Sequence, residues 1–456
     1  MKRLDNFSKF ENLRKEFHFF SYDTYQYLFT GNSLEISFSF NISGKYFFNP
    51  CVSIPYKSKL FRPFDSLSAV ALDNLIFHIG MIELISYWKA ACPPEVIIKP
   101  HILSASQIKF WKKIYFQGLG EFFFINSIRV DEDDFMEMHC TDGNQLISFP
   151  LISSGECLIP VGGGKDSSVT MGLFNKTGEN WLPFVINLRN TTKEVIHAAG
   201  KNENQTVEFN REIHPQLLKL NGEGFLNGHT PFSALLAFYS LLAAYLTGRT
   251  EIVLSNESSA NEVTVPGTTI NHQYSKSFEF EKDFRDYTKG NISPGFNYFS
   301  LLRPLSELQI ARLFSEMPEF LRHFKSCNAG SKTDTWCGAC PKCLFTFIIL
   351  SPFLKPETLV GIFGKNLLDD PSLKDTFEQL SGKQGIKPFE CIGTVDEVNV
   401  ALDLAVKMYR EDELPYLLRV HHRPLPLDKS RGNSLDSSGA HFVPEKYFNL
   451  LEKALR

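Results

Sequence analysis

An apolar run followed by three glycines and a Lys-Asp pair constrains the fold of this chain more than any other segment. Residues 157–161 have the composition of a short buried strand, and the residues after them are Gly162, Gly163, Gly164, Lys165, Asp166, Ser167 and Ser168. Glycine has no Cβ, so the loop N–H groups can approach a polyphosphate, and a following helix adds unpaired N–H donors and partial positive charge. The segment predicts a phosphate-binding loop; the alternative is a tight strand-to-helix turn without a ligand.

The spacing of this loop decides between known kinds of phosphate loop. A Walker A loop would need glycine at position 159 and Ser or Thr at position 166, where Ile159 and Asp166 stand. The dinucleotide fingerprint would need a third glycine at the position of Ser167. The GGGKDS form resembles the SGGxDS signature of the PP-loop ATP pyrophosphatases, which cleave ATP to AMP and pyrophosphate. That resemblance implies ATP as a ligand.

Four cysteines form a second pattern with C-x9-C-x2-C-x2-C spacing, at Cys327, Cys337, Cys340 and Cys343. Two x2 spacings place three thiolates on one knuckle, and the fourth can complete a tetrahedral shell around zinc at residues 327–343. A redox CxxC pair and inert buried cysteines are the alternatives. Of the other five cysteines, Cys391 alone lies in a polar motif.

Composition indicates an enzyme of ordinary charge. The 456 residues include 47 basic and 51 acidic side chains, for a net charge of −4. The chain has no surplus of basic residues, so its overall charge does not favour nucleic acid as a partner. The amino end lacks the apolar core of a signal peptide. The run 232–247 is uncharged but short for a bilayer and is bracketed by proline and glycine. We expect a cytoplasmic protein with no membrane partner.

The chain divides near residues 149–156 by pattern. Residues 1–150 predict a smaller α+β domain of unassigned role, with strands at 34–40, 46–48 and 122–124 and a helix over 67–91. Residues 151–456 predict an α/β domain, a doubly wound parallel sheet that follows the PP-loop. Its strand candidates are 157–161, 183–188, 205–209 and 251–255, with a long helix at 231–247 as one crossover.

Polar residues follow the strand candidate at 251–255. Parallel strands present ligands at their carboxyl ends, so we expect Asn256, Glu257 and Asn261 to face the same cleft as the phosphate loop. His272 and Lys276 follow and could move a proton if burial tunes their pKa. Turn formation in a solvated loop is the alternative. Arg303 precedes a helix start with Ser306 as N-cap and either binds an anion or forms a surface ion pair.

The motifs together resemble a family. GGGKDS, SNESSAN, NHQYSKSFEFE, SLLRPLSELQIARLF, WCGACPKC and KPFECIG are similar to the MurL family of UDP-N-acetyl-α-D-muramoyl-L-alanyl-L-glutamate epimerases. The resemblance covers residues 157–393. The loop and cysteines alone fit the 7-cyano-7-deazaguanine synthase group equally well, which would make an amide, nitrile or thiolated product. The intervening motifs favour the epimerase.

The resemblance implies that ATP is consumed to convert the terminal L-glutamate of a UDP-muramoyl-dipeptide to D-glutamate, in peptidoglycan precursor synthesis. An acyl-adenylate would acidify the Cα proton. Mg²⁺ would bridge the phosphates near Asp166, with the zinc knuckle structural. Asn256, Glu257, Asn261 and Arg303 would bind substrate. We predict His272 and Lys276 as the acid and base, with Cys391 and Glu257 as alternatives.

Overall fold

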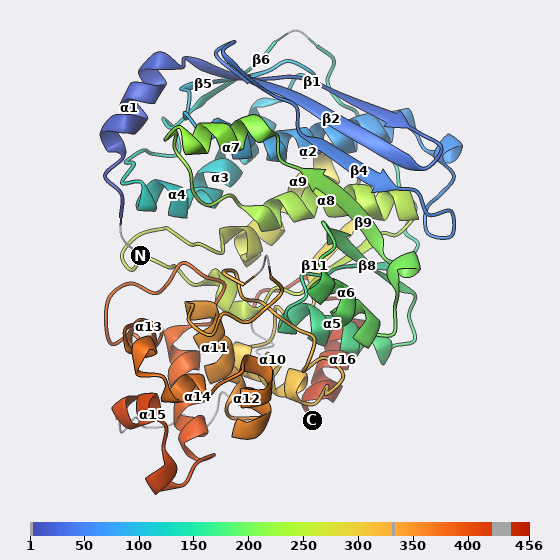
Figure 1. The fold of residues 1–456 in the computed structure, drawn as a ribbon. Helices are drawn as coiled ribbons and strands as arrows, with labels where there is room; N and C mark the ends of the chain where they lie inside the picture. Colours follow the sequence, from blue (N-terminus) through green and yellow to red (C-terminus); the bar gives the residue numbers. More distant parts are fainter. Residues whose placement is uncertain (1–2, 142, 331–332, 422–438) are drawn as a thin grey trace.

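The protein is seen in a computed structural model that describes residues 3–141, 143–330, 333–421 and 439–456. Through these residues runs one mixed sheet with the strand order β11-β10-β7-β8-β9-β4-β2-β1-β5-β6, and β3 pairs with β2 (Figure 1). The strands are β1 (Phe19–Phe29), β2 (Ser33–Ile42), β3 (Tyr46–Phe48), β4 (Cys51–Pro55), β5 (Glu95–Ile98), β6 (Glu137–Cys140), β7 (Cys157–Pro160), β8 (Trp181–Ile186), β9 (Val207–Glu212), β10 (Glu251–Leu254) and β11 (Asn297–Ser300).

Helices cover the sheet and build a separate lower layer in Figure 1. In chain order they are α1 (Phe7–Glu16), α2 (Ala69–Trp88), α3 (Ala105–Gly118), α4 (Gly120–Ile125), α5 (Lys165–Asn175), α6 (Asn190–Ala198), α7 (Pro215–Gly222), α8 (Phe232–Thr247), α9 (Phe278–Asn291), α10 (Glu307–Ser315), α11 (Pro341–Leu350), α12 (Pro356–Phe363), α13 (Lys374–Leu380), α14 (Val395–Val406), α15 (Tyr416–His421) and α16 (Glu445–Leu455).

The sheet has two parallel ends and an antiparallel middle. β11, β10, β7, β8 and β9 are parallel to one another, as are β1, β5 and β6. Antiparallel pairing of β9 with β4, with Cys51 opposite Glu212, joins the two ends. The strands predicted from residue 157 onward and at 34–40 and 46–48 are confirmed within a few residues. The sheet continues through the predicted boundary at 149–156, which lies between β6 and β7.

One predicted strand is wrong. Phe122, Phe123 and Phe124 lie in the short helix α4. Phe122 and Phe123 are buried, and Asn126 Nδ2 donates to the carbonyl of Phe122 at 2.9 Å as the helix ends. Burial of aromatic rings against neighbouring elements has outweighed their preference for strands.

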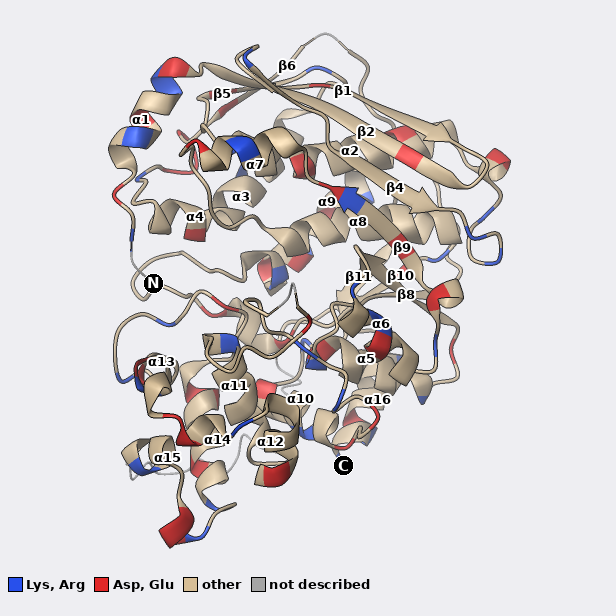
Figure 2. Cartoon of the chain, viewed as in Figure 1, with Lys and Arg blue, Asp and Glu red and all other residues tan. Residues whose placement is uncertain are grey.

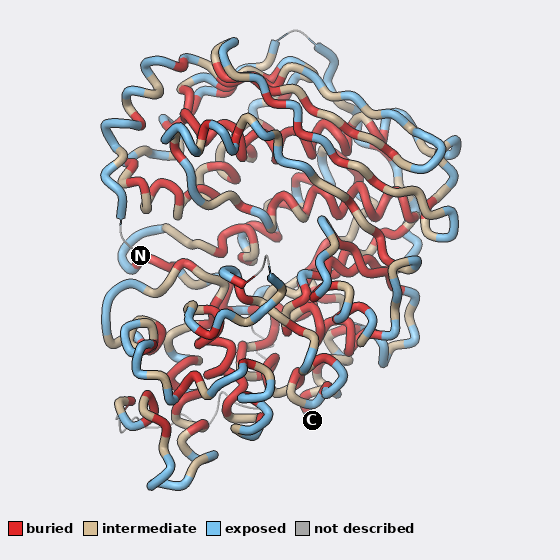
Figure 3. The backbone as a smooth tube through the Cα atoms, viewed as in Figure 1, coloured by how far each residue is buried: buried red, intermediate tan, exposed pale blue. Residues whose placement is uncertain are grey.

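Two apolar helices lie inside the molecule. α2 begins at Ser68, whose Oγ accepts from Ala71 N at 3.4 Å, and almost all of it is buried (Figure 3). α8 ends at Gly248, whose φ of +71° suits glycine. The sequence analysis singled out 232–247 as the membrane-like run. Among the described helices, however, α2 is the one long and apolar enough to span a bilayer. Of its apolar 18-residue stretch, 83% is buried in the protein. Burial identifies α2 as a core helix.

The apolar core divides into two clusters that meet at the sheet. The first joins α2 and α8 to the β1–β2 region, and the second joins α5, α10, α11 and α14. Cations and anions are interspersed along the elements (Figure 2). β7 and β10 are parallel neighbours, so their carboxyl ends lie at the same edge of the sheet.

Candidate active site

The glycine loop turns from β7 into α5 as the sequence predicts. Gly163 has φ +86°, and a Cβ there would approach Thr192 Oγ1 at 3.1 Å. Among the described residues, no side chain caps the N-terminus of α5 at Gly164. The Oγ atoms of Ser167 and Ser168 donate to the Gly164 carbonyl at 3.2 and 2.9 Å. The first-turn N–H groups of α5 are therefore available to an anion.

Lys165 carries a buried charge between two carboxylates. Its Nζ pairs with Asp166 and with Glu307, which is the first residue of α10. Burial acts to lower the pKa of Lys165, but the two carboxylates outweigh it and raise the pKa. Burial, reinforced by Asp166 and Glu257 and opposed by Lys165, raises the pKa of Glu307 to about 7. Lys165 stays an ammonium ion.

The polar residues after β10 take different positions. Glu257 is buried, and its negative charge acts to raise the pKa of Lys165 and the pKa of Lys276. Asn256 Nδ2 donates to Ser300 Oγ at 3.1 Å. Asn261 is exposed, and its Oδ1 accepts from Phe278 N at 2.7 Å.

Arg303 is a buried structural cation rather than a surface ion-pair former. It is 3% exposed and donates to the Glu257 carbonyl at 2.6 Å and to Glu281 at 3.1 Å. It also donates to the carbonyl of Lys276. Arg303 thus ties the segment after β10 to the segment that carries Lys276. Its use in substrate binding stays a prediction.

Lys276 and Cys391 form a second charged pair beside the loop. Burial acts to lower the pKa of Lys276, but Cys391, Glu257 and Asp166 outweigh it and hold the pKa above its ordinary value. Burial acts to raise the pKa of the Cys391 thiol, but Lys276, His272 and Lys342 lower it to about 6. Lys276 is therefore held as a cation, and the thiol is held as a thiolate near neutral pH.

His272 links this pair to the N-terminal half of the chain. Its Nδ1 lies 2.5 Å from Glu121 Oε2 on α4, and the ring is close enough to Cys391 for that thiol to act on its pKa. Burial acts to lower the pKa of His272, but Cys391 and Glu121 raise it to about 9. His229 Nδ1 lies 3.3 Å from the same Glu121 oxygen, and burial and His272 lower the pKa of His229 to about 4.

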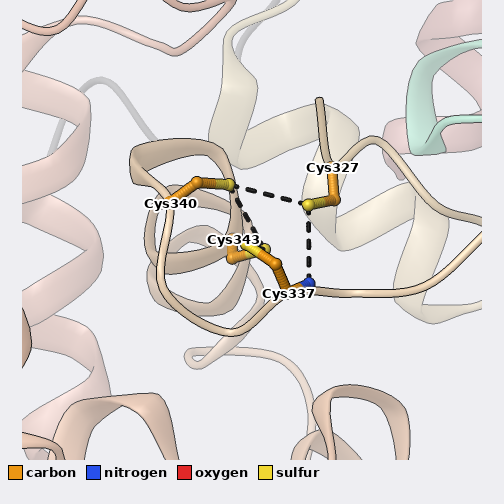
Figure 4. Close-up of side chains that lie close together, drawn as sticks. All are labelled: Cys327, Cys337, Cys340 and Cys343. Carbon is orange, nitrogen blue, oxygen red and sulfur yellow. Dashed lines mark hydrogen bonds between the residues drawn. The ribbon is translucent and has the colours of Figure 1, made fainter. Parts of the chain in front are cut away.

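The four cysteines cluster at the start of α11 (Figure 4). The Sγ atom of Cys340 lies 3.7 Å from that of Cys327 and 3.5 Å from that of Cys343. The Sγ atoms of Cys337 and Cys343 lie 3.7 Å apart. Four thiolates 2.3 Å from a tetrahedral zinc ion would be about 3.8 Å apart. Gly330 N also donates to Cys327 Sγ at 3.1 Å. The cluster could hold one metal ion, with spacing compatible with zinc.

The sequence prediction missed several residues of this site. Glu307 was identified as a helix start, not as the partner of Lys165. Lys342 donates to the Cys391 carbonyl, and Arg189 donates to the Gly162 carbonyl at 3.2 Å. Glu121 directly precedes the segment 122–124 that was assigned to a strand, and lies in α4. Glu307 and Lys342 stand within quoted motifs, but the motifs do not reveal their partners, because tertiary contacts bring these residues to the site.

Charges buried together at the carboxyl edge of a parallel sheet characterise an α/β enzyme. Comparison with known families then identifies which one: the MurL N-terminal domain matches residues 11–301 and the MurL C-terminal domain matches residues 323–426. The chain belongs to the MurL family, as its motifs suggested. The N-terminal match spans the predicted boundary near residue 150, in agreement with the continuous sheet.

Three curated relatives cover most of the chain, and each is named UDP-N-acetyl-alpha-D-muramoyl-L-alanyl-L-glutamate epimerase. The protein of Xanthomonas oryzae pv. oryzae is 33% identical over 77% of this chain and 81% of its own. That of Salinispora tropica is 33% identical over 84% of each chain. That of a Micromonospora species is 31% identical over 90% of this chain and 92% of its own. An isomerase is therefore the class of enzyme that these similarities support.

Proposed function

We propose that this protein uses ATP to epimerise the terminal L-glutamate of UDP-MurNAc-L-Ala-L-Glu, releasing AMP and pyrophosphate. One observation supports the proposal: the Asp166 carboxylate, in the first turn of α5, is near enough to Lys276 for its charge to act to raise the pKa of that side chain. A phosphate site at the loop and a proton-transfer site at Lys276 would therefore adjoin each other. The names of the curated relatives supply the substrate.

ATP is needed because the substrate's carboxylate opposes the chemistry. Removing the Cα proton next to an ionised carboxylate would place a second negative charge on the same unit. Transfer of AMP to the α-carboxylate removes the first charge, so that the Cα proton of the acyl-adenylate can be taken by a positioned base. Hydrolysis after reprotonation on the opposite face yields D-glutamate and AMP.

The loop residues suit the phosphate half of this reaction. The N–H groups of Gly162, Gly163 and Gly164 and the open first turn of α5 would hold pyrophosphate. Lys165, kept cationic by its two carboxylates, would stabilise the leaving charge. Asp166 is the carboxylate best placed for Mg²⁺, which would neutralise phosphate charge. Zinc at the four cysteines would be structural, because all four ligand positions are filled by protein.

His272 and Lys276 stay the predicted proton carriers, and the charge of Cys391 acts to raise the pKa of both. Lys276 is held as an ammonium ion and suits the donor that reprotonates the carbanion. His272, with its pKa raised to about 9, is also protonated at neutral pH. Two cations stabilise a carbanion, but neither offers an empty base in this state. The one that acts as base must therefore lose its proton before it takes the Cα proton.

The proposal is tested with purified protein, ATP, Mg²⁺ and UDP-MurNAc-L-Ala-L-Glu. AMP release and the chirality of the product glutamate are measured together, and we expect both to appear at matched rates. An enzyme of the 7-cyano-7-deazaguanine synthase type would instead require ammonia or a sulfur donor and would leave L-glutamate unchanged. AMP formation without D-glutamate, at any ammonia concentration, contradicts epimerisation.

A further inference from the structure

A pocket of about 330 Å³ lies at the corner where α3 meets α4. Its walls come from the end of α3 with α4, from the residues 128–131 that follow α4, and from the residues 268–270 of the loop between β10 and α9. Arg3 lines it as well. A second hollow, of about 510 Å³, shares Arg3 and Arg129 with the first. Two guanidinium groups therefore lie where these two hollows of the surface adjoin.

Arg3 is held in this position by the backbone around it. Leu4 N donates to the carbonyl of Ile125 at 2.7 Å, so the N-terminal segment runs beside α4 (Figure 1). Arg3 Nε donates to the carbonyl of Phe124 at 3.2 Å, and the guanidinium carbon lies 4.5 Å from the centroid of the Phe124 ring. In the described part of the chain these contacts use one guanidinium donor, so the other N–H groups are available to a ligand.

The two arginines offer charges that suit a diphosphate. Both side chains are exposed, and among the described residues neither guanidinium forms an ion pair. Asp131 lines the first pocket and Asp5 the second, without pairing with either arginine. An arginine fork binds a phosphate group through two parallel hydrogen bonds, so two unpaired forks around one pocket suit two linked phosphates. A carboxylate such as that of Asp131 suits the hydroxyl groups of a ribose.

The rest of the wall suits the base of a nucleotide. Phe116 and Phe124 are half-buried and offer aromatic surface, and exposed Thr269 offers a hydroxyl group. Aromatic side chains bind bases by stacking, and a few polar groups among apolar ones are typical of a small-molecule pocket. The volume lies at the lower end of the range of about 300 to 1,000 Å³ for such pockets. A pyrimidine nucleotide is the class of ligand that these features favour.

The pocket is connected to the proposed reaction site by a shared segment and by ring contacts. Ile270 lines the pocket, and His272 follows it by two residues. The Phe124 ring, on the pocket wall, lies 5.5 Å from the Phe389 ring, which lies 6.1 Å from the His272 imidazole, by ring centroids. One elongated substrate can therefore have one end in the pocket and the other at the predicted proton carriers.

We propose that this pocket binds the uridine diphosphate end of the substrate, with Arg3 and Arg129 on the diphosphate. The inference rests on the proposed function, whose substrate has a nucleotide at one end and the reacting glutamate at the other. The nucleotide does not change during epimerisation, so the pocket holds the substrate and takes no part in the chemistry. The N-terminal half of the chain thereby gains a role in recognising the substrate.

The first experiment measures binding of UDP alone, without ATP, by isothermal titration calorimetry. Wild type should bind UDP, and Arg3→Ala and Arg129→Ala should each weaken binding by about 10-fold or more, because each removes a charged donor to phosphate. Arg129→Lys should recover part of the loss, since lysine keeps the charge without the fork. Arg322→Ala, which removes an exposed arginine outside the pocket, is the matched control. Absence of UDP binding to wild type, or wild-type affinity in both alanine variants, overturns the proposal.

The second experiment separates binding from chemistry. With UDP-MurNAc-L-Ala-L-Glu, Arg129→Ala should raise KM by about 10-fold or more and leave kcat nearly unchanged, as expected for a contact made equally in the ground state and the transition state. With MurNAc-L-Ala-L-Glu, which lacks the nucleotide, Arg129→Ala and wild type should have the same kcat/KM. An equal loss with both substrates overturns the proposal. A wild-type protein that binds UDP but forms no D-glutamate defeats the proposed function and leaves the pocket assignment in place.

Discussion

Lys165 is the single buried charge on which the proposed phosphate site depends. Lys165→Ala removes the cation that faces the leaving pyrophosphate and leaves Glu307 without its partner. We expect AMP formation to fall by about 100-fold or more, since losing one aligned charge at a developing anion has that effect. AMP release measured by chromatography checks this. Lys176→Ala, exposed at the far end of α5, is the control. A Lys165→Ala enzyme with normal turnover would refute the loop assignment.

Residues with local signals were predictable, and those with tertiary partners were not. The glycine loop and the cysteine motif each lie within a short stretch of sequence. In the structure the glycine loop makes the expected turn, and the four cysteines come together as expected. Glu307, Lys342 and Glu121 depend on helices brought in from distant parts of the chain. The direction of the Lys276 pKa also required structure, because three anions outweigh its burial.

We expect the cysteine knuckle to stabilise the element that follows it, because Cys340 and Cys343 lie at the start of α11, whose apolar residues are almost all buried. Cys340→Ser should release the metal and lower the melting temperature by more than about 5 °C, since metal binding of this kind is folding free energy. Metal analysis of the purified protein should show about one zinc ion per chain. Cys51→Ser, at the exposed thiol of β4, serves as control. Equal stability of a metal-free Cys340→Ser protein would exclude a structural zinc site.

At the scale of elements, strands with a clear apolar pattern were predicted and several others were missed. β7, β8, β9 and β10 lie within a few residues of their expected positions. β11 and β6 are as short as β7 and β10, but their sequences mix polar and apolar residues and give a weak signal. The helix at α4 was mistaken for a strand, since three consecutive phenylalanines favour strands and only packing decides otherwise.

The whole molecule is held together by one sheet and by a core that crosses the predicted boundary. β9 pairs with β4, and α8 packs against α2 within the first core cluster. A fragment of residues 151–456 would expose the apolar face of α8 and the edge of β9. We expect it to be insoluble or unfolded, as judged by circular dichroism and gel filtration. A soluble fragment that binds zinc and forms AMP would show that the halves fold independently.

The central claim is that ATP activates the glutamate before its Cα proton is removed. It requires the phosphate loop and the proton-transfer residues to act on one substrate molecule. The most direct test is deuterium incorporation at the glutamate Cα in D₂O, with and without ATP. An acyl-adenylate route predicts incorporation that accompanies AMP release and is absent without ATP. Incorporation without ATP, or D-glutamate formed with no deuterium at Cα, would contradict this account.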